Sequence, residues 1–251
     1  GINSDGTIRF AAVGGIDSRV LLAKALRIGP NGVPGVIGCR PIHLLEDKDT
    51  AGAPELKQLA IEIGADSQEN AEQLVQVGDY ITFDTHFEVL DEEPGGLRMV
   101  KGKALDDRAG CSVLIDLLAD RYPFELYAVF TAQEEVGLRG ARVAAHSVAP
   151  DLAFVLEGTI CDDLPKKRDE SPVTRVGDGP AITFMDRSFI ADRRLFDLLV
   201  DTARQLGIPF QLKQAVAGGT DAGAIHLARE GIPSVTVAVP ARSIHAPVAM
   251  M

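Results

Sequence analysis

Acidic residues stand next to each other at two places in the second half of the sequence. Asp106 and Asp107 precede an apolar stretch, and Glu134 and Glu135 follow the apolar run Glu125–Ala132. Neighbouring carboxylates raise each other's pKa unless a cation lies between them. The first pair is also typical of a helix N-cap, and the second of solvated loop charges. Each pair alone therefore leaves a structural interpretation open.

Two further polar residues end strand-like runs. Glu157 closes the apolar run Leu152–Leu156, and His245 follows the run Ser234–Pro240. Burying an unpaired carboxylate costs on the order of several kcal/mol, so we expect a metal ion or an arginine near Glu157. A single histidine in such a place is more often structural than a ligand. Ligand sites of open α/β sheets gather where strands end, and carboxylates with an imidazole suit zinc or cobalt better than calcium or magnesium.

The elements that would position these residues change in type along the chain. Up to about residue 88 the sequence predicts a β-rich domain with one capped helix, Ser67–Val75, and with short strands at Thr7–Val13, Gly35–Cys39, Leu56–Gly64 and Tyr80–Phe83. From Lys103 onward, apolar strands alternate with helices such as Asp192–Leu206. This alternation indicates an α/β sheet covered by helices on both faces.

Length and charge narrow the function classes. The chain has 251 residues, 46% of them hydrophobic, and a net charge of −11, which indicates a soluble globular protein. An acidic protein is repelled by nucleic acids and anionic membranes, so neither is expected as a partner. No apolar run approaches the roughly 18 residues that cross a bilayer. Three scattered cysteines without a CxxC pair indicate reduced thiols and a cytoplasmic location.

The order of the motifs resembles one family of enzymes. ALDDRAG, TAQEEVGLRGA, a strand-end acid, GDGPAIT and AGGTDAGAIHLAREGIPSVTVAVPARSIHAP follow one another as in the tetrahedral aminopeptidases. These are dinuclear metallopeptidases that include glutamyl, leucyl and lysyl aminopeptidases, and some members have been labelled endoglucanases. The segments GVIGCRPIH and IEIGADSQENAEQL resemble the family's inserted β-barrel domain. The resemblance covers nearly the whole chain.

The resemblance implies a three-layer α/β sandwich core at residues 89–251 and a small β-barrel domain for dimer contacts at residues 1–88. The family takes one more metal ligand from the histidine of an HxD motif before the barrel, and it has a final helix after the last motif. This chain matches neither part. We therefore expect the N-terminal part of the core to be absent and the catalytic domain to be incomplete at both ends. The other histidines are not convincing replacements for this ligand: His43, His86, His146 and His226.

The resemblance also implies a role for each site residue. Asp106 is the bridging metal ligand, Asp107 is its neighbour across an unusual cis peptide, and Glu134 is the general base. Where this chain has Glu157, the family most often has aspartate, which is also a carboxylate. The terminal metal ligands are Glu135, Glu157 and His245.

These roles predict an aminopeptidase that removes N-terminal residues from peptides. Two zinc or cobalt ions per subunit activate a water molecule, and Glu134 takes its proton and passes it to the leaving amine. The segment that contains Gly219, Thr220 and Asp221 resembles part of the substrate-pocket wall, where glycine permits close backbone approach. The same segment is compatible with a tight turn that caps a helix. By resemblance, the subunits form dimers that assemble into a dodecamer.

Three alternatives remain open. A related metal-dependent deacylase or carboxypeptidase would have a similar core and a different substrate anchor. An endoglucanase-like glycosidase would use Glu134 with a second carboxylate, but the chain has no Trp and only three Tyr for sugar stacking. A non-catalytic relative is suggested by the missing histidine ligand.

Overall fold

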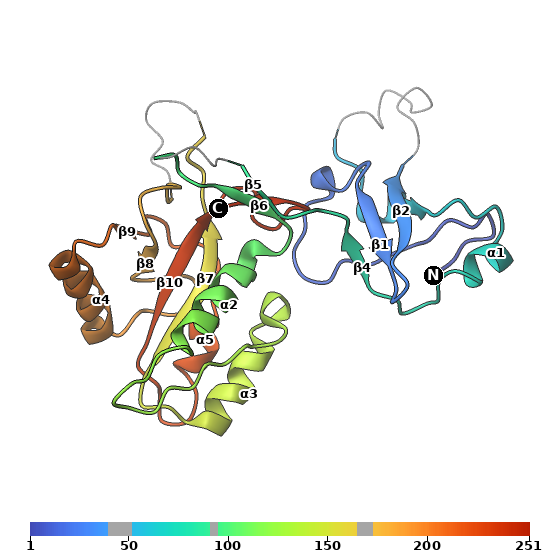
Figure 1. Cartoon of the computed structure of the whole chain (residues 1–251). Helices are drawn as coiled ribbons and strands as arrows, with labels where there is room; N and C mark the ends of the chain where they lie inside the picture. Colours follow the sequence, from blue (N-terminus) through green and yellow to red (C-terminus); the bar gives the residue numbers. More distant parts are fainter. Residues whose placement is uncertain (40–51, 91–94, 165–172) are drawn as a thin grey trace. The chain divides into compact units, whose positions relative to one another are not determined.

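The computed structural model describes residues 1–39, 52–90, 95–164 and 173–251, and these residues form two compact units. The first unit consists of Gly1–Phe87 and His245–Pro247, and the second of Glu88–Ile244 and Val248–Met251. The first unit has one sheet and the second has two (Figure 1). Each unit also has its own apolar core. The division into a dimerisation domain at residues 1–88 and a catalytic domain at residues 89–251 stays a prediction.

The first unit is built on a four-stranded antiparallel sheet. Its strands are β1 (Ala25–Ile28), β2 (Val33–Gly38), β3 (Ala60–Glu62) and β4 (Ile81–Phe83), in the order β3-β2-β1-β4. In β1, exposed and buried residues alternate, as expected of a strand with one face on the core. The buried core is made of Ile8, Leu21, Leu26, Ile28, Ile37, Leu59, Ile61 and Val75.

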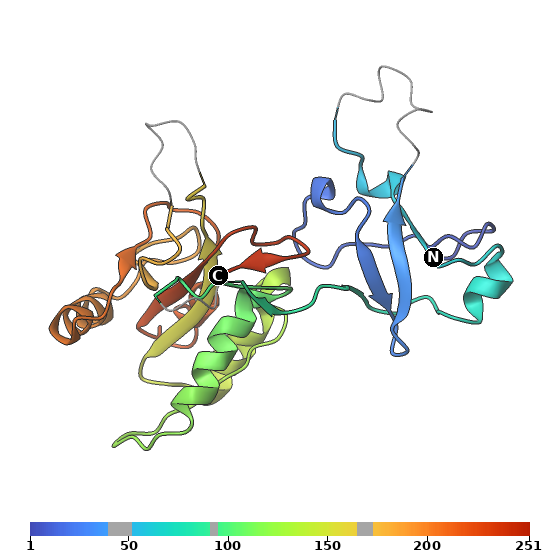
Figure 2. The ribbon, with the colours of Figure 1, turned by 45° about the horizontal axis from the view of Figure 1, so that its top comes forward.

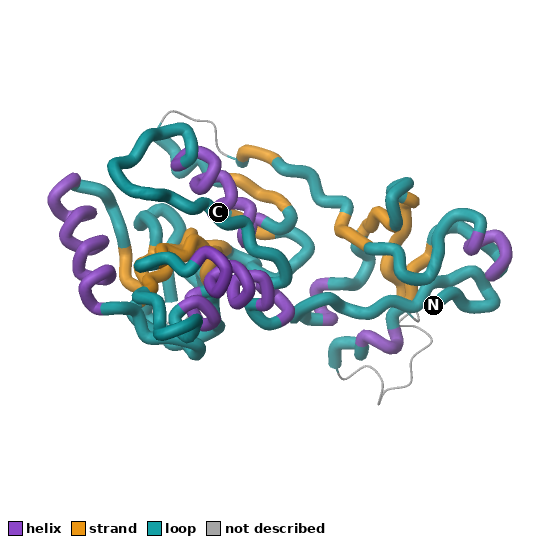
Figure 3. Tube along the Cα trace, turned by 90° about the horizontal axis from the view of Figure 1, so that it is seen from below, coloured by secondary structure: helices purple, strands orange, loops and turns teal. Residues whose placement is uncertain are grey.

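Short helices and long connections complete this unit (Figure 3). The helices are η1 (Ser18–Val20), η4 (Leu56–Gln58) and α1 (Gln68–Glu72). The predicted capped helix is confirmed, since the Ser67 hydroxyl accepts a hydrogen bond from the Asn70 amide.

Two predictions for the first unit differ from the structure. The predicted strand Thr7–Val13 is wrong, because Ile8 alone forms bridges, to Ile2 and Ile61, and no continuous ladder follows. The described residues form an open four-stranded sheet, so the predicted closed β-barrel is not found in them. His43 lies outside the described residues.

The second unit contains the sheet that positions the acids. Its strands are β7 (Ala153–Ile160), β8 (Ala181–Thr183), β9 (Gln211–Leu212) and β10 (Ser234–Ala241), in the order β7-β10-β8-β9. β10 runs parallel to β7 (Figure 2). This pairing places Ala238 opposite Glu157. Six of the eight residues of β10 are buried, as expected of a central strand.

Helices that the sequence predicted pack against this sheet. α2 (Leu105–Leu117) contacts β7 and β10, and α4 (Arg193–Leu206) contacts β8 and β10 (Figure 1). α3 (Arg139–Val148) packs against the short helix α5 (Ala222–Ile225), and η5 (Glu134–Val136) precedes α3. A small sheet orders β11 (Ala249–Met250), β6 (Val100–Gly102) and β5 (Glu88–Val89). The predicted α/β class is confirmed.

The apolar run Glu125–Ala132 does not form the strand that its sequence predicts. It pairs with no strand in the described part of the chain. Its large apolar side chains are exposed, namely Leu126, Tyr127, Val129 and Phe130. The composition of this run suits a strand, but a strand of a sheet forms only when a second strand supplies its hydrogen bonds.

No helix in the four described ranges is long and apolar enough to cross a membrane.

Candidate metal centre

The first acidic pair lies at an irregular start of α2. Ala104 has a left-handed backbone, and Asp106 and Asp107 have non-helical backbone angles. The peptide bond between the two aspartates is cis, as the resemblance implied. The Asp107 carboxylate accepts a hydrogen bond of 2.9 Å from the Gly110 amide, which is the interaction of an N-cap residue. Asp107 therefore has the helix-capping role that the sequence left open for this pair.

Asp106 has a different partner. Its carboxylate accepts a hydrogen bond of 3.0 Å from the Gly158 amide, which brings the start of α2 against β7. A Cβ atom at Gly158 would lie 2.7 Å from this carboxyl group. The approach thus requires glycine at this position, a requirement that the sequence analysis did not identify.

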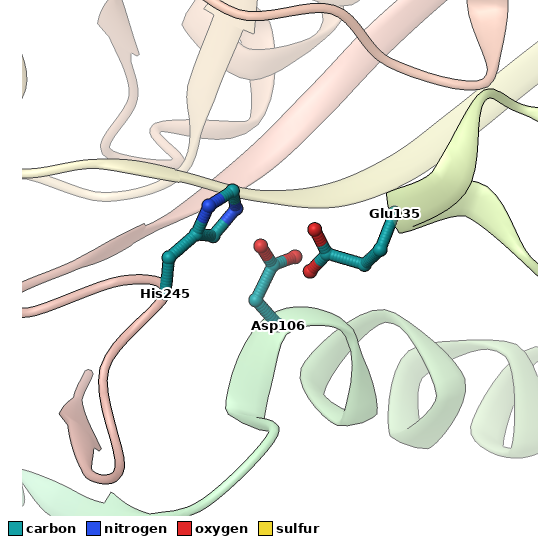
Figure 4. A group of neighbouring side chains, drawn as sticks. All are labelled: Asp106, Glu135 and His245. Carbon is teal, nitrogen blue, oxygen red and sulfur yellow. The ribbon is translucent and has the colours of Figure 1, made fainter. Parts of the chain in front are cut away.

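Asp106, Glu135 and His245 form one group of possible ligands. Each offers a ligand atom, and these atoms lie within 4.8 Å of one another. Figure 4 shows the Asp106 carboxylate between that of Glu135 and the His245 ring. The three side chains come from the start of α2, from η5 and from the loop after β10. The structure thus brings together three of the four residues that the sequence analysis named as metal ligands.

The fourth, Glu157, lies in a second group with Glu134 and Asp221, whose ligand atoms also lie within 4.8 Å of one another. Glu157 and Asp221 are buried. The Asp221 amide donates a 3.0 Å hydrogen bond to Glu157 Oε1, and the Thr131 hydroxyl donates a 2.5 Å bond to Asp221 Oδ2. Asp221 Oδ1 is buried without a hydrogen-bond partner in the described structure.

Burial and mutual repulsion govern the protonation of these acids. Burial raises the pKa of Glu157 to about 9 and that of Glu134 to about 7, and the charges of neighbouring acids add to both shifts. Burial likewise raises the pKa of Asp107 to about 7 and that of Asp221 above its ordinary value. The ionised forms would be favoured again by a cation among them.

The residues fit a divalent metal ion. A buried carboxylate oxygen without a partner is costly, and Asp221 Oδ1 is such an atom at the second group. The donors are carboxylates and one imidazole, a set that suits zinc and related metals. Neither group includes the described histidines His86, His146 and His226.

The residues of the segment Gly219–Asp221 have different surroundings, since one lies in the core and another in the second acid group. The Thr220 hydroxyl is buried and lies 3.1 Å from Asp186 Oδ2 and 3.2 Å from the Thr236 hydroxyl. Asp221 precedes α5, but its side chain makes no capping hydrogen bond and belongs to the second acid group. Gly219 is exposed. A substrate-binding role for these three residues stays a prediction.

Sequence reasoning missed Thr131. Its hydroxyl bonds to Asp221, which is 90 positions away in the chain. Thr131 lies within a motif that the sequence analysis identified, but nothing in its local pattern indicated this partner.

The structure thus combines a mixed α/β fold with two groups of side chains that could each hold a metal ion. The chain belongs to the Peptidase M42 family, described as M42 glutamyl aminopeptidase, whose model matches residues 1–251. It is 34% identical over 256 residues to the glutamyl aminopeptidase of Lactococcus lactis subsp. cremoris, a match that covers 97% of this chain and 69% of the relative.

Solved structures agree with this family. A TET aminopeptidase from a marine sediment archaeon of the Thaumarchaeota matches with a TM-score of 0.92 and 38% identity, covering 100% of this chain and 72% of the other. The TET1 peptidase of Pyrococcus horikoshii matches with a TM-score of 0.83 and 34% identity, covering 100% and 73%. The Pyrococcus protein can assemble into a tetrahedron or a large octahedral shell.

Proposed function

We propose that the protein is a metal-dependent aminopeptidase that removes N-terminal residues from peptides. Membership of the M42 family supports peptidase activity. The observation that carries the proposal is the pair of ligand groups, because Glu134 and Glu135 are adjacent in the chain and belong to different groups. One acid can then serve as a metal ligand while its neighbour transfers protons.

The residues that would hold two divalent ions, zinc or cobalt, are Asp106, Glu135, Glu157 and His245. Asp107 supports the site by capping α2. Ions held there would polarise the scissile carbonyl and lower the pKa of water.

Glu134 acts as the general base in this proposal. It is partly buried and lies with Glu157 and Asp221. A carboxylate that is not itself a ligand can accept a proton from the attacking water and donate it to the leaving amine while staying in place. Gly219, Thr220 and Asp221 would contribute to the wall of the substrate pocket.

The variant Glu134→Gln tests this role. The amide has nearly the same shape but cannot carry the proton, so we expect hydrolysis of an unblocked peptide to be lost while the bound metal per chain stays unchanged. Metal content is measured by elemental mass spectrometry, with two ions per chain expected. Glu125→Gln, at an exposed residue of the same segment, should retain wild-type turnover. Undiminished turnover by Glu134→Gln would rule out the assigned base.

A substrate panel tests the reaction type. We expect release of the first residue from peptides with a free amino terminus and none from N-acetylated peptides. Release of C-terminal residues or deacylation of blocked substrates would instead indicate a carboxypeptidase or deacylase, and release of sugars from glucans a glycosidase. No turnover together with no bound metal would indicate a non-catalytic relative.

Self-association is part of the proposal. The assembly of the similar Pyrococcus peptidase into a tetrahedron or an octahedral shell supports it. We expect dimers that combine into a dodecamer, measured by light scattering on a sizing column. A monomer at micromolar concentration would contradict this expectation.

A further inference from the structure

Glu134 begins the short helix η5, shortly after the segment of residues 125–131. Residues 125–131 have no ladder partner in the described part of the chain. The loop that follows bonds to itself and to the start of α3. The Gly137 and Leu138 amides donate to the Glu134 carbonyl, and the Gly140 amide donates to the Ala132 carbonyl. These local bonds shape the loop without tying it to β7, which carries Glu157.

A side-chain hydrogen bond makes a longer-range connection. Thr131 lies three residues before Glu134. Its hydroxyl donates a hydrogen bond of 2.5 Å to Asp221 Oδ2. The backbone amide of the same Asp221 donates to Glu157 Oε1 at 3.0 Å. Asp221 therefore contacts both the segment of Glu134 and the carboxylate of Glu157.

Asp221 is suited to hold a fixed position. It is only 5% exposed, and its carbonyl accepts hydrogen bonds from the Ala224 and Ile225 amides of α5. The preceding Thr220 hydroxyl is buried and lies within hydrogen-bonding distance of the Asp186 carboxylate and the Thr236 hydroxyl. The backbone around Asp221 is thus anchored to β10 and α5, while its carboxylate faces the acid group.

We propose that Thr131 and Asp221 form a positioning pair that holds Glu134 beside Glu157. The inference rests on the proposed function for the role of Glu134. A proton-transferring group misplaced by about 1 Å can cost a hundredfold in rate, so a single hydrogen bond that sets its position has a measurable effect. Neither residue needs to touch the substrate for this role.

The variant Thr131→Val tests the pair, since it removes the hydroxyl and keeps the shape of the side chain. We expect kcat to fall by about 10- to 100-fold with KM changed less than threefold. Thr131→Ser restores the hydroxyl and should recover most of kcat. Thr7→Val is the matched control, because the Thr7 hydroxyl donates to Asp5 in the first unit; its kcat should equal that of the wild type.

A double-mutant cycle with Asp221→Ala adds a second criterion. If the two residues act as one pair, the double variant should lose no more kcat than the more damaged single variant. Additive losses would overturn the pairing.

Hydrogen exchange of the metal-free protein tests the pair independently of catalysis. Loss of the Thr131 bond should speed exchange of the Gly137, Leu138 and Gly140 amides by about tenfold, and Thr7→Val should not. If even the wild type hydrolyses no peptide, the proposed function fails and exchange alone decides the pair. Thr131→Val that matches Thr7→Val in both kcat and exchange overturns the proposal.

Discussion

Two carboxylates on one stretch of chain have opposite electrostatic surroundings. Glu157 lies in β7, where burial and neighbouring acids raise its pKa to about 9. Asp163 lies six positions later, where the Arg242 guanidinium, 2.6 Å away, holds the pKa of the carboxyl well below its usual range. Asp163 has its cation within the chain, whereas Glu157 forms no salt bridge among the described residues. Asp163 is thus neutralised by a cation of the chain, whereas Glu157 is the acid that we propose as a ligand of an external cation.

Glu157→Gln should have the largest effect on function. An amide keeps an oxygen for the Asp221 amide but loses the charge that a cation needs. We expect metal affinity to fall by about 100-fold or more and peptide turnover to fall with it. The melting temperature of the metal-free protein at pH 7 should rise, because glutamine removes the free-energy cost of burying this carboxyl and protonating it on folding. Calorimetric metal titration and thermal unfolding check both parts, and unchanged affinity would remove Glu157 from the ligand set.

Gly158→Ala tests whether the acid group depends on close backbone approach. The added Cβ would meet the Asp106 carboxyl, so we expect metal affinity to fall by about 10- to 100-fold and stability to fall by about 1–3 kcal/mol. Titration and urea unfolding measure the two effects. Gly52→Ala is the control, since nothing lies within 4 Å of its Cβ position. If Gly158→Ala and Gly52→Ala have equal metal affinity and equal stability, glycine is not required at position 158.

Asp163→Asn should reduce stability without reducing metal binding. Asp163 is nearly buried and Arg242 one-fifth exposed, so we expect a loss of about 3 kcal/mol at pH 7. The folded pKa lies below the unfolded value of about 3.9. The pair therefore stabilises above pH 4, and its contribution disappears as the pH falls through the folded pKa.

Urea unfolding at several pH values checks this prediction. The difference in the free energy of unfolding between the wild type and Asp163→Asn should become smaller below pH 4. Asp197→Asn breaks an exposed pair with Arg193 and should cost less than about 0.5 kcal/mol. If the difference in the free energy of unfolding between the wild type and Asp163→Asn does not change with pH, the electrostatic explanation is wrong.

Thr159→Val should have the smallest effect, in the favourable direction. The Thr159 hydroxyl is buried in β7 and has no hydrogen-bond partner in the described structure. Replacing it with a methyl group removes an unsatisfied polar atom, so we expect about 1 kcal/mol of added stability and unchanged turnover. Urea unfolding measures the change. A loss of stability would reveal a partner for this hydroxyl.

Local patterns in the sequence determined much of the second unit. Apolar runs predicted β7 and β10, and the periodic pattern predicted α4, because burial imposes these periods on neighbouring residues. The acids and the histidine were identified by type and by a predicted position at strand ends, which is wrong for Glu157, because this residue lies inside β7. The motif order led to the family, which the comparisons confirm.

The tertiary structure alone decided which of these residues meet. The hydrogen bonds from Gly158 to Asp106, from Asp221 to Glu157 and from Thr131 to Asp221 join residues 52, 64 and 90 positions apart. No periodicity encodes such pairs, because they depend on how distant elements pack. The same reason explains the run 125–132, whose composition suits a strand but whose state depends on a partner elsewhere. Residue types are local properties, whereas hydrogen-bond partners are supplied by the fold.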